Sequence, residues 1–364
     1  MEVTQIYDLV NSVVSQGVGL TELTVVDTNS LVALGNTILS DNKYTENFIN
    51  TLVDRIGKTI LSFRKYTNKL ADMVLDDFEY GALVQKIKVE MPEVEADESI
   101  LENGKSVDMY KVSKPKARQS FFSKETPYQI KITIQRKWLK QAFISETEMG
   151  GFISAVFGEV QNKLDLTLET LGRACIANFA VNTSNVRNLV TEFNSISGKN
   201  LTAEESLYDS DFLRFAVAEI KKVSKKMTEM SRIYNDGSAD RHTPFEMQKI
   251  KVLSDFETQL ETVVQYMAFN EKFVSLNGFQ EFGFWQSIKD SMTISARNAD
   301  NEDVVIENVV AIIHDKDALG MYKKEELTST TPFNSAGLYT NTYWHEQQMW
   351  FNDLSENFVL FTLN

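Results

Sequence analysis

Hydrophobic residues at helical spacing mark the middle of the chain. Over residues 152–179 they recur in steps of three and four, which predicts one long helix on the order of 45 Å at 1.5 Å per residue. Ser145, followed three residues later by Glu148, is typical of a helix start. Cys175 falls on the apolar face, where we expect a small buried side chain. Shorter helical patterns lie at 44–56, 211–232 and 254–269.

Strict alternation of apolar and polar residues predicts strands on both sides of these helices. The pattern is clear at 83–91 and 128–138. In the last third of the chain, β-branched runs at 304–306 and 309–313, an aromatic stretch at 337–344 and alternation at 357–363 also predict strands. Strands, then helices, then strands again predict an α+β fold rather than a regularly alternating α/β fold. We expect residues 1–45 to form an extended arm with one short helix near 6–14.

The segment that follows the first predicted strand separates its charges. Acidic residues dominate 90–108 and basic residues dominate 111–124, with Asn103 and Gly104 between them. Asn-Gly is a strong signal for a two-residue hairpin turn. Antiparallel pairing would then place acidic side chains opposite basic ones. The alternative is a solvated loop.

We expect this hairpin to lie against another molecule, because it holds too few apolar residues for a core of its own. The candidate intersubunit contacts are Glu93, Glu95, Asp97, Glu98, Lys111, Lys114, Lys116 and Arg118.

Net charge narrows the classes of partner. The 364 residues carry 51 acidic and 37 basic side chains, a net charge of −14. This balance argues against a protein whose main role is to grip DNA phosphates or an anionic membrane surface. No apolar stretch approaches a membrane span, and no basic leader opens the chain. A single cysteine excludes a disulfide framework and a multi-cysteine metal site.

One basic cluster stands out against the acidic background. Its lysines recur at helical spacing, so they share one face of the helix predicted at 211–232. We interpret the face as solvated, with a phosphate-facing patch as the alternative, and weak, non-specific contact with DNA is the expected consequence. The cluster consists of Lys221, Lys222, Lys225 and Lys226.

Motifs that carry chemistry are missing. His242, His314 and His345 are not at metal-ligand spacing, and no nucleophile elbow or phosphate-binding loop occurs. His314 and Asp315 could act as a general base and its carboxylate partner in a hydrolase site. A polar turn at the end of a strand is the simpler interpretation. We therefore predict no catalytic residues, no metal and no cofactor.

Three segments, in chain order, carry a resemblance to a known family. The first is the run NFINTLVDRIG at 47–57, and the second is the strand at 130–143 that leads into the long helix. The third consists of Asp315, Lys316, Asp317, Asn334, Gly337, Leu338, Tyr339, Asn341, Tyr343 and His345. In this order and spacing the chain resembles the major capsid proteins of tailed bacteriophages, which have the Hong Kong 97-type shell fold, and among them the small podophage (picovirus-type) branch.

The resemblance implies a division of the chain. Residues 1–60 would be an N-terminal arm and 80–127 an extended hairpin loop over a neighbouring subunit. A peripheral domain would take 61–79 and 128–185, with its spine helix at 149–180. An axial domain would take 186–335, and 336–364 would return as closing strands. No appended immunoglobulin-like domain is expected.

The function implied is that of a non-enzymatic head protein that forms an icosahedral or prolate shell around double-stranded DNA. Its implied partners are copies of itself in pentamers and hexamers, a scaffolding protein, a portal and the packaged DNA, with no membrane. It would be assembled in the host cytoplasm and end in the virion capsid. Two alternatives remain open: a bacterial nanocompartment shell of the same fold, and a soluble hydrolase that uses His314 and Asp315.

Overall fold

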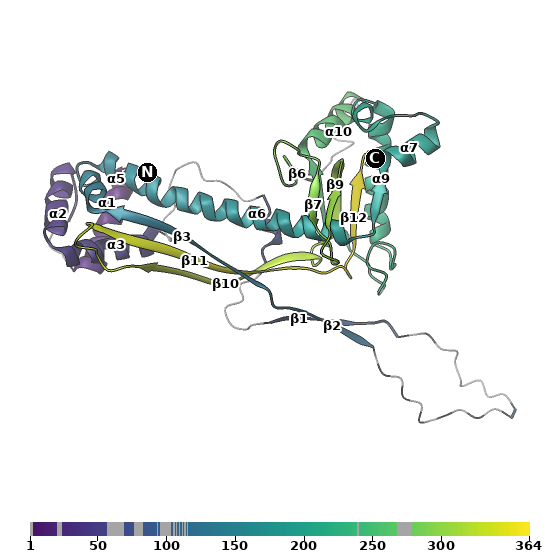
Figure 1. Ribbon diagram of the computed structural model, residues 1–364, viewed down its shortest axis with the longest axis horizontal. Coiled ribbons are helices and arrows are strands. Elements are labelled where there is room, and N and C mark those ends of the chain that lie inside the picture. The colour runs from purple at the N-terminus through teal and green to yellow at the C-terminus, as the bar shows by residue number, and fades with distance from the viewer. Residues whose placement is uncertain are drawn as a thin grey trace. The chain divides into compact units, whose positions relative to one another are not determined.

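The computed structural model describes residues 3–19, 24–56, 69–75, 83–92, 94, 103–104, 106, 108, 110, 112, 114, 116–238, 240–267 and 279–364 (Figure 1). The chain divides into two compact units. The first combines Met1–Glu79, Glu125–Leu171 and Tyr322–Met349, and the second combines Tyr80–Lys124, Gly172–Met321 and Trp350–Asn364. The finer division into arm, peripheral and axial domains stays a prediction.

The short helix expected near 6–14 is present, but the extended conformation expected for the rest of 1–45 was wrong, because residues 28–40 and 42–45 are helical as well. The first three helices are α1 (Val3–Val13), which continues as one π-helical turn at Val14–Val18, α2 (Thr28–Ser40) and α3 (Asn42–Ile56). Asp27 caps α2 by accepting a hydrogen bond from the backbone N–H of Ser30 at 2.7 Å. Each helix buries one apolar stripe, so tertiary packing stabilises helices whose local signals are weak.

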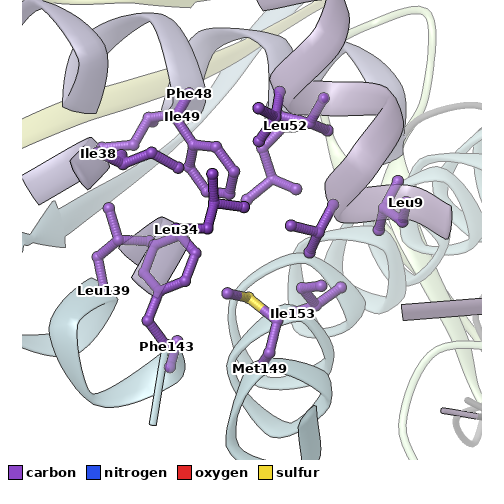
Figure 2. Packing of buried hydrophobic residues seen from close by; sticks show 14 of the residues in the cluster. Leu9, Leu34, Ile38, Phe48, Ile49, Leu52, Leu139, Phe143, Met149 and Ile153 are labelled. Carbon is purple, nitrogen blue, oxygen red and sulfur yellow. The ribbon is translucent and has the colours of Figure 1, made fainter. Parts of the chain in front are cut away.

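These stripes meet in one core within the first unit. Figure 2 shows Phe48 and Leu52 of α3 packed with Leu34 of α2 and with side chains from α4 (Arg136–Ala142) and α5 (Glu146–Ile153). The rings of Phe48 and Phe143 lie 5.2 Å apart between centroids. Gly35 on α2 sits directly against Phe143, where an added Cβ would come within 2.5 Å of that side chain.

The predicted long helix is confirmed with a modification. Helical turns run through α5, a π-helical turn at Ser154–Gly158 and α6 (Glu159–Asn182). Ser145 caps the first turn by accepting a hydrogen bond from the N–H of Glu148 at 3.3 Å. The π turn follows the two glycines that weaken this part of the helix in the sequence, and such turns are inserts in otherwise α-helical segments.

The first unit also holds most of a three-stranded sheet. Its order is β10 (Leu319–Thr330), β11 (Tyr339–Asn352) and β3 (Glu125–Gln135), with Trp344 opposite Ile130. These strands confirm the predictions over 128–135 and 339–344, whereas the strand predicted to continue to 138, and in the family resemblance to 143, ends at Gln135, where α4 begins.

The second unit is built on a five-stranded sheet. The order is β4 (Val186–Asn188), β12 (Phe358–Thr362), β9 (Val309–Asp315), β5 (Gln248–Leu253) and β6 (Phe279–Phe282). Every residue of β9 and β12 is buried, which explains the apolar run at 309–313. The alternation expected at 357–363 therefore does not separate a buried face from an exposed one. The Phe179 and Phe358 rings stack with centroids 4.2 Å apart.

The second unit also contains further helices and a two-stranded hairpin. The helices are α7 (Leu189–Ser197), α8 (Ala203–Ser206), α9 (Ser210–Met227) and α10 (Ser254–Met267), and the strands β7 (Ile294–Arg297) and β8 (Asp303–Ile306) form a hairpin. Two 3₁₀ turns lie at Ala71–Met73 in the first unit and Phe245–Met247 in the second. In the part of the chain that the structure describes, no helix is both long and apolar enough to cross a membrane.

Candidate subunit-contact surface

A β-hairpin flanks the charged segment, and the predicted pairing of the acidic and basic limbs beyond Glu90 and Lys116 stays a prediction. Strands β1 (Val84–Val89) and β2 (Ala117–Phe122) pair antiparallel (Figure 1), and the ladder extends by a hydrogen bond from the N–H of Glu90 to the carbonyl of Lys116 at 2.8 Å. Asn103 and Gly104 form a turn in which Gly104 has φ +88°. That backbone conformation favours glycine, so the Asn-Gly signal was a correct indicator of the turn.

The base of the hairpin is held by an ion cluster. Lys88 Nζ lies 2.6 Å from Asp353 Oδ2 and 2.9 Å from Glu356 Oε1, while Lys86 Nζ lies 3.1 Å and 2.9 Å from the same two atoms. Arg241 Nε approaches Glu356 Oε2 at 3.8 Å. Three cations and two carboxylates therefore share one site in the second unit.

Electrostatics within the cluster favour the ionised forms. Burial acts to raise the pKa of Asp353, but hydrogen bonds from Lys88 and Ser355 and the charges of both lysines outweigh it and lower that pKa to about 2. Burial likewise acts to lower the pKa of Lys86, but the carboxylates of Glu356 and Asp353 hold it above its usual value. Beside the cluster, the rings of Phe122 and Phe351 pack with centroids 4.9 Å apart.

The predicted contact residues on the hairpin divide into two groups. Lys114, Lys116 and Arg118 are exposed, and Arg118 Nε lies 2.7 Å from Glu90 Oε1, which is the expected kind of pair between a basic and an acidic limb. Five others lie outside the described residues, and their role stays a prediction: Glu93, Glu95, Asp97, Glu98 and Lys111.

The second predicted surface is the lysine face of α9. Lys221, Lys222, Lys225 and Lys226 are all exposed, opposite the buried stripe of the same helix. Lys222 Nζ lies 2.7 Å from Glu219 Oε1. The structure thus places the four lysines together, as their spacing predicts, and their contact with DNA stays a prediction.

His314 and Asp315, the residues of the possible hydrolase site, are buried in the core of the second unit. His314 is 1% exposed, and its Nδ1 lies 2.8 Å from the backbone carbonyl of Asp315 rather than from a carboxylate. Asp315 accepts a hydrogen bond from Thr243 Oγ1 at 2.7 Å, and burial raises its pKa. Burial also raises the pKa of the Cys175 thiol to about 12, which is unfavourable for a nucleophile.

No metal centre emerges among the described residues, where no three His, Cys, Asp or Glu side chains are grouped to hold an ion. The residues that sequence reasoning missed are Asp353 and Glu356. They lie in a short turn before β12, far along the chain from the lysines they bind, and no local pattern links the two segments.

Comparison with known proteins establishes the family. The family model described as "Phi29-like phage major capsid protein" matches residues 10–362. The chain belongs to that family. A curated relative, the major capsid protein of Bacillus phage GA-1, is 22% identical over 370 residues, which cover 99% of this chain and 70% of the relative. The function is accordingly that of a shell-forming phage head protein that assembles with copies of itself and resides in the virion capsid.

Solved structures agree on the fold. The capsid structure of Staphylococcus phage Andhra matches with a TM-score of 0.58 at 12% identity, covering 84% of this chain and 87% of that one. A capsid structure of cyanophage P-SCSP1u matches with a TM-score of 0.51 at 11% identity, covering 84% and 90%. The chain has the Hong Kong 97-type capsid fold, in the α+β class, as predicted. The family match decides against a nanocompartment shell.

Proposed function

We propose that this head protein forms a closed icosahedral or prolate shell, built of pentamers and hexamers, that encloses double-stranded DNA. Its further partners are a scaffolding protein and a portal, and assembly takes place in the host cytoplasm without a membrane. The observation that carries the proposal is the family match along nearly the whole chain. In a shell, contacts that are individually modest become strong through their number.

Negative-stain microscopy and sedimentation test the shell. The chain is expressed alone and together with the scaffolding protein of its phage, and closed particles are expected in at least one preparation. Monomers in both preparations would contradict the proposal.

The charged limbs of the hairpin are the proposed intersubunit contacts that set register. Exposed ion pairs contribute only about 0–1 kcal/mol each, so complementary charge acts more on orientation than on affinity. The exposure of Lys114, Lys116 and Arg118 supports this role. The double substitution Lys114→Glu/Lys116→Glu should lower the yield of closed particles. The matched control is Lys221→Glu/Lys225→Glu, which makes the same change of charge on α9. The yield of empty shells from this control should equal that of the wild type.

The lysine face of α9 is the proposed, weak contact with packaged DNA. A chain with net charge −14 repels DNA overall, so a small basic face would touch phosphates without holding them. Fluorescence anisotropy of a labelled duplex at 50 and 200 mM salt tests this. Lys221→Gln/Lys225→Gln/Lys226→Gln should abolish the low-salt binding, whereas Lys114→Gln/Lys116→Gln should retain most of it.

No enzymatic activity is proposed. The burial of His314 and its contact with a backbone carbonyl support this, because a general base must reach its substrate. Shells of the His314→Ala variant should hydrolyse a model ester no more slowly than wild-type shells do. A hydrolysis of a model ester that wild-type shells catalyse and His314→Ala shells do not would contradict it.

A further inference from the structure

The turn at Asn103 and Gly104 places an amide side chain next to a backbone nitrogen that has no side chain beside it. Both residues are exposed, and Gly104 adopts φ +88°. A Cβ built on Gly104 would meet nothing within 4 Å, so the space beside its backbone is open. Exposed turns with small and polar residues are where a chain is most accessible to chemical change.

An asparagine that precedes a glycine is chemically labile. The backbone nitrogen of the glycine can close a five-membered ring onto the side-chain carbon Cγ of the asparagine, and an attack within one chain has a large advantage of proximity. A Cβ on the following residue obstructs this attack. A helix or a hydrogen-bonded amide opposes it as well, because either one holds the two atoms apart. Asparagine is for such reasons a thermolabile residue.

Asparagines that precede other small residues are held in place. Asn194 lies within α7 before a serine, and its amide group bonds both backbone groups of Leu201 at 3.0 Å. Asn11 lies within α1 before another serine, and its amide group bonds both backbone groups of Val25 at 2.7 and 2.9 Å. A second Asn-Gly pair, at 277–278, lies outside the described residues. In the described part of the chain, Asn103 is thus the asparagine that precedes a glycine, and it lies in an exposed turn.

We propose that Asn103 is a site of spontaneous deamidation, and that it reacts faster than the other asparagines of the described residues. The Gly104 nitrogen bonds to Cγ of Asn103 while the bond from Cγ to Nδ2 breaks. Nδ2 leaves as ammonia and takes the proton that the Gly104 nitrogen gives up. Water then opens the cyclic imide at either of its carbonyl carbons, which produces aspartate or isoaspartate. The net reaction consumes one water, releases one ammonia and involves no oxidation or reduction.

The reaction changes the charge of the chain at one defined place. It adds a negative charge to a chain of net charge −14, between the acidic and the basic segment of the hairpin. Isoaspartate also inserts a methylene group into the backbone of a turn that depends on Gly104. Because Asn103 is exposed, neither product removes a buried contact, and the fold is expected to persist. The inference concerns the single chain and does not depend on the proposed shell.

Peptide mapping by mass spectrometry tests the site. The full-length protein is incubated at pH 8 in ¹⁸O-labelled water and then digested at pH 6 in ordinary water, so that deamidation during the incubation carries the heavy oxygen. The peptide that contains Asn103 should gain the label at least tenfold faster than the peptides that contain Asn194 or Asn11. Equal rates at the three positions would overturn the inference.

Two variants test whether ring closure causes the reaction. Gly104→Ala places a methyl group beside the attacking nitrogen, and Asn103→Gln requires a larger ring that closes slowly. Labelling at position 103 should fall at least tenfold in each variant. Gly237→Ala is the matched control, because Gly237 also has a positive φ, +74°, and open space around it. This control should label Asn103 at the wild-type rate. Labelling of either test variant at the wild-type rate would overturn the inference.

The products distinguish ring opening from direct hydrolysis of the amide. Electron-transfer fragmentation of the labelled peptide separates aspartate from isoaspartate at position 103. Both products are expected, because water can attack either carbonyl carbon of the imide. Aspartate alone would show that the Gly104 nitrogen takes no part, and it would overturn the proposed reaction.

Discussion

Lys88 and Asp353 are 265 residues apart in the chain, yet Lys88 Nζ lies 2.6 Å from Asp353 Oδ2 at the base of the hairpin. Their side chains are 9% and 5% exposed. An ion pair so far from water is costly to break, because the remaining charge is left buried. Together with the ion pairs of Lys86 and Glu356, this contact ties the hairpin to the turn before the last strand.

Removal of one partner should therefore destabilise the second unit. We expect Asp353→Asn to lower the free energy of unfolding by about 3 kcal/mol. This loss is at the low end for breaking a buried ion pair, because Glu356 remains 2.9 Å from Lys88 and still neutralises its charge. Urea denaturation followed by circular dichroism measures the change. The control is Asp303→Asn, which breaks the exposed pair with Arg297 and should cost less than about 1 kcal/mol. Equal losses in the two variants would contradict the assigned role of the cluster.

The same pair predicts how stability depends on pH. The pKa of Asp353 is lowered to about 2 in the folded protein, from 3.8 for an unperturbed aspartate. Its contribution to stability is thus fully present above pH 3.8 and is lost as pH falls from 3.8 through 2. The difference in unfolding free energy between wild type and Asp353→Asn should be constant from pH 8 to 5 and shrink below pH 3.8. A difference that already disappears at pH 5 would show that the folded pKa is not lowered.

Glu346 predicts the opposite dependence in the first unit. Burial and the charge of Glu326 raise its pKa, and Glu346 Oε2 has no hydrogen-bond partner among the residues that the structure describes. The ionised form is therefore penalised in the folded protein at pH values above that raised pKa. Glu346→Gln should stabilise the protein by about 1 kcal/mol at pH 7, and the gain should vanish below pH 4.5, where the carboxyl is protonated in both states. Unfolding midpoints at pH 7 and 4 test it, and a loss of stability at pH 7 would refute it.

Two glycines of the first unit should respond to alanine in opposite directions. Gly35→Ala forces a methyl group within 2.5 Å of Phe143, and we expect a loss of about 1–3 kcal/mol from overpacking. Gly151→Ala in α5 meets nothing within 4 Å and removes a poor helix former, so a gain of up to about 1 kcal/mol is expected. Thermal unfolding of the two variants measures both effects. Similar behaviour at the two positions would mean that contact with Phe143 does not constrain α2.

Local sequence patterns predicted the structure correctly where it depends on residues that are close together in the chain. Helical spacing predicted the long helix, and Asn103 with Gly104 predicted the hairpin turn, because both depend on backbone preferences and near neighbours. Of the N-terminal helices, α1 and α3 were predicted near 6–14 and at 44–56, whereas α2 was missed, since its stability comes from burial in the core of the first unit rather than from strong local signals. The family resemblance likewise rested on short motifs in a fixed order, which the family match confirms.

The sequence by itself determined that Lys86 and Lys88 lie on one side of β1 and Ile87 and Val89 on the other, because side chains alternate along any strand. Which side is buried was decided only by the tertiary structure. Hydrophobicity alone favours burial of the apolar side. The fold instead brings Asp353 and Glu356 beneath the lysines, and two carboxylates that neutralise buried cations outweigh that preference in the single subunit. Such a reversal depends on residues far apart in the chain, so no periodicity within the hairpin could have predicted it.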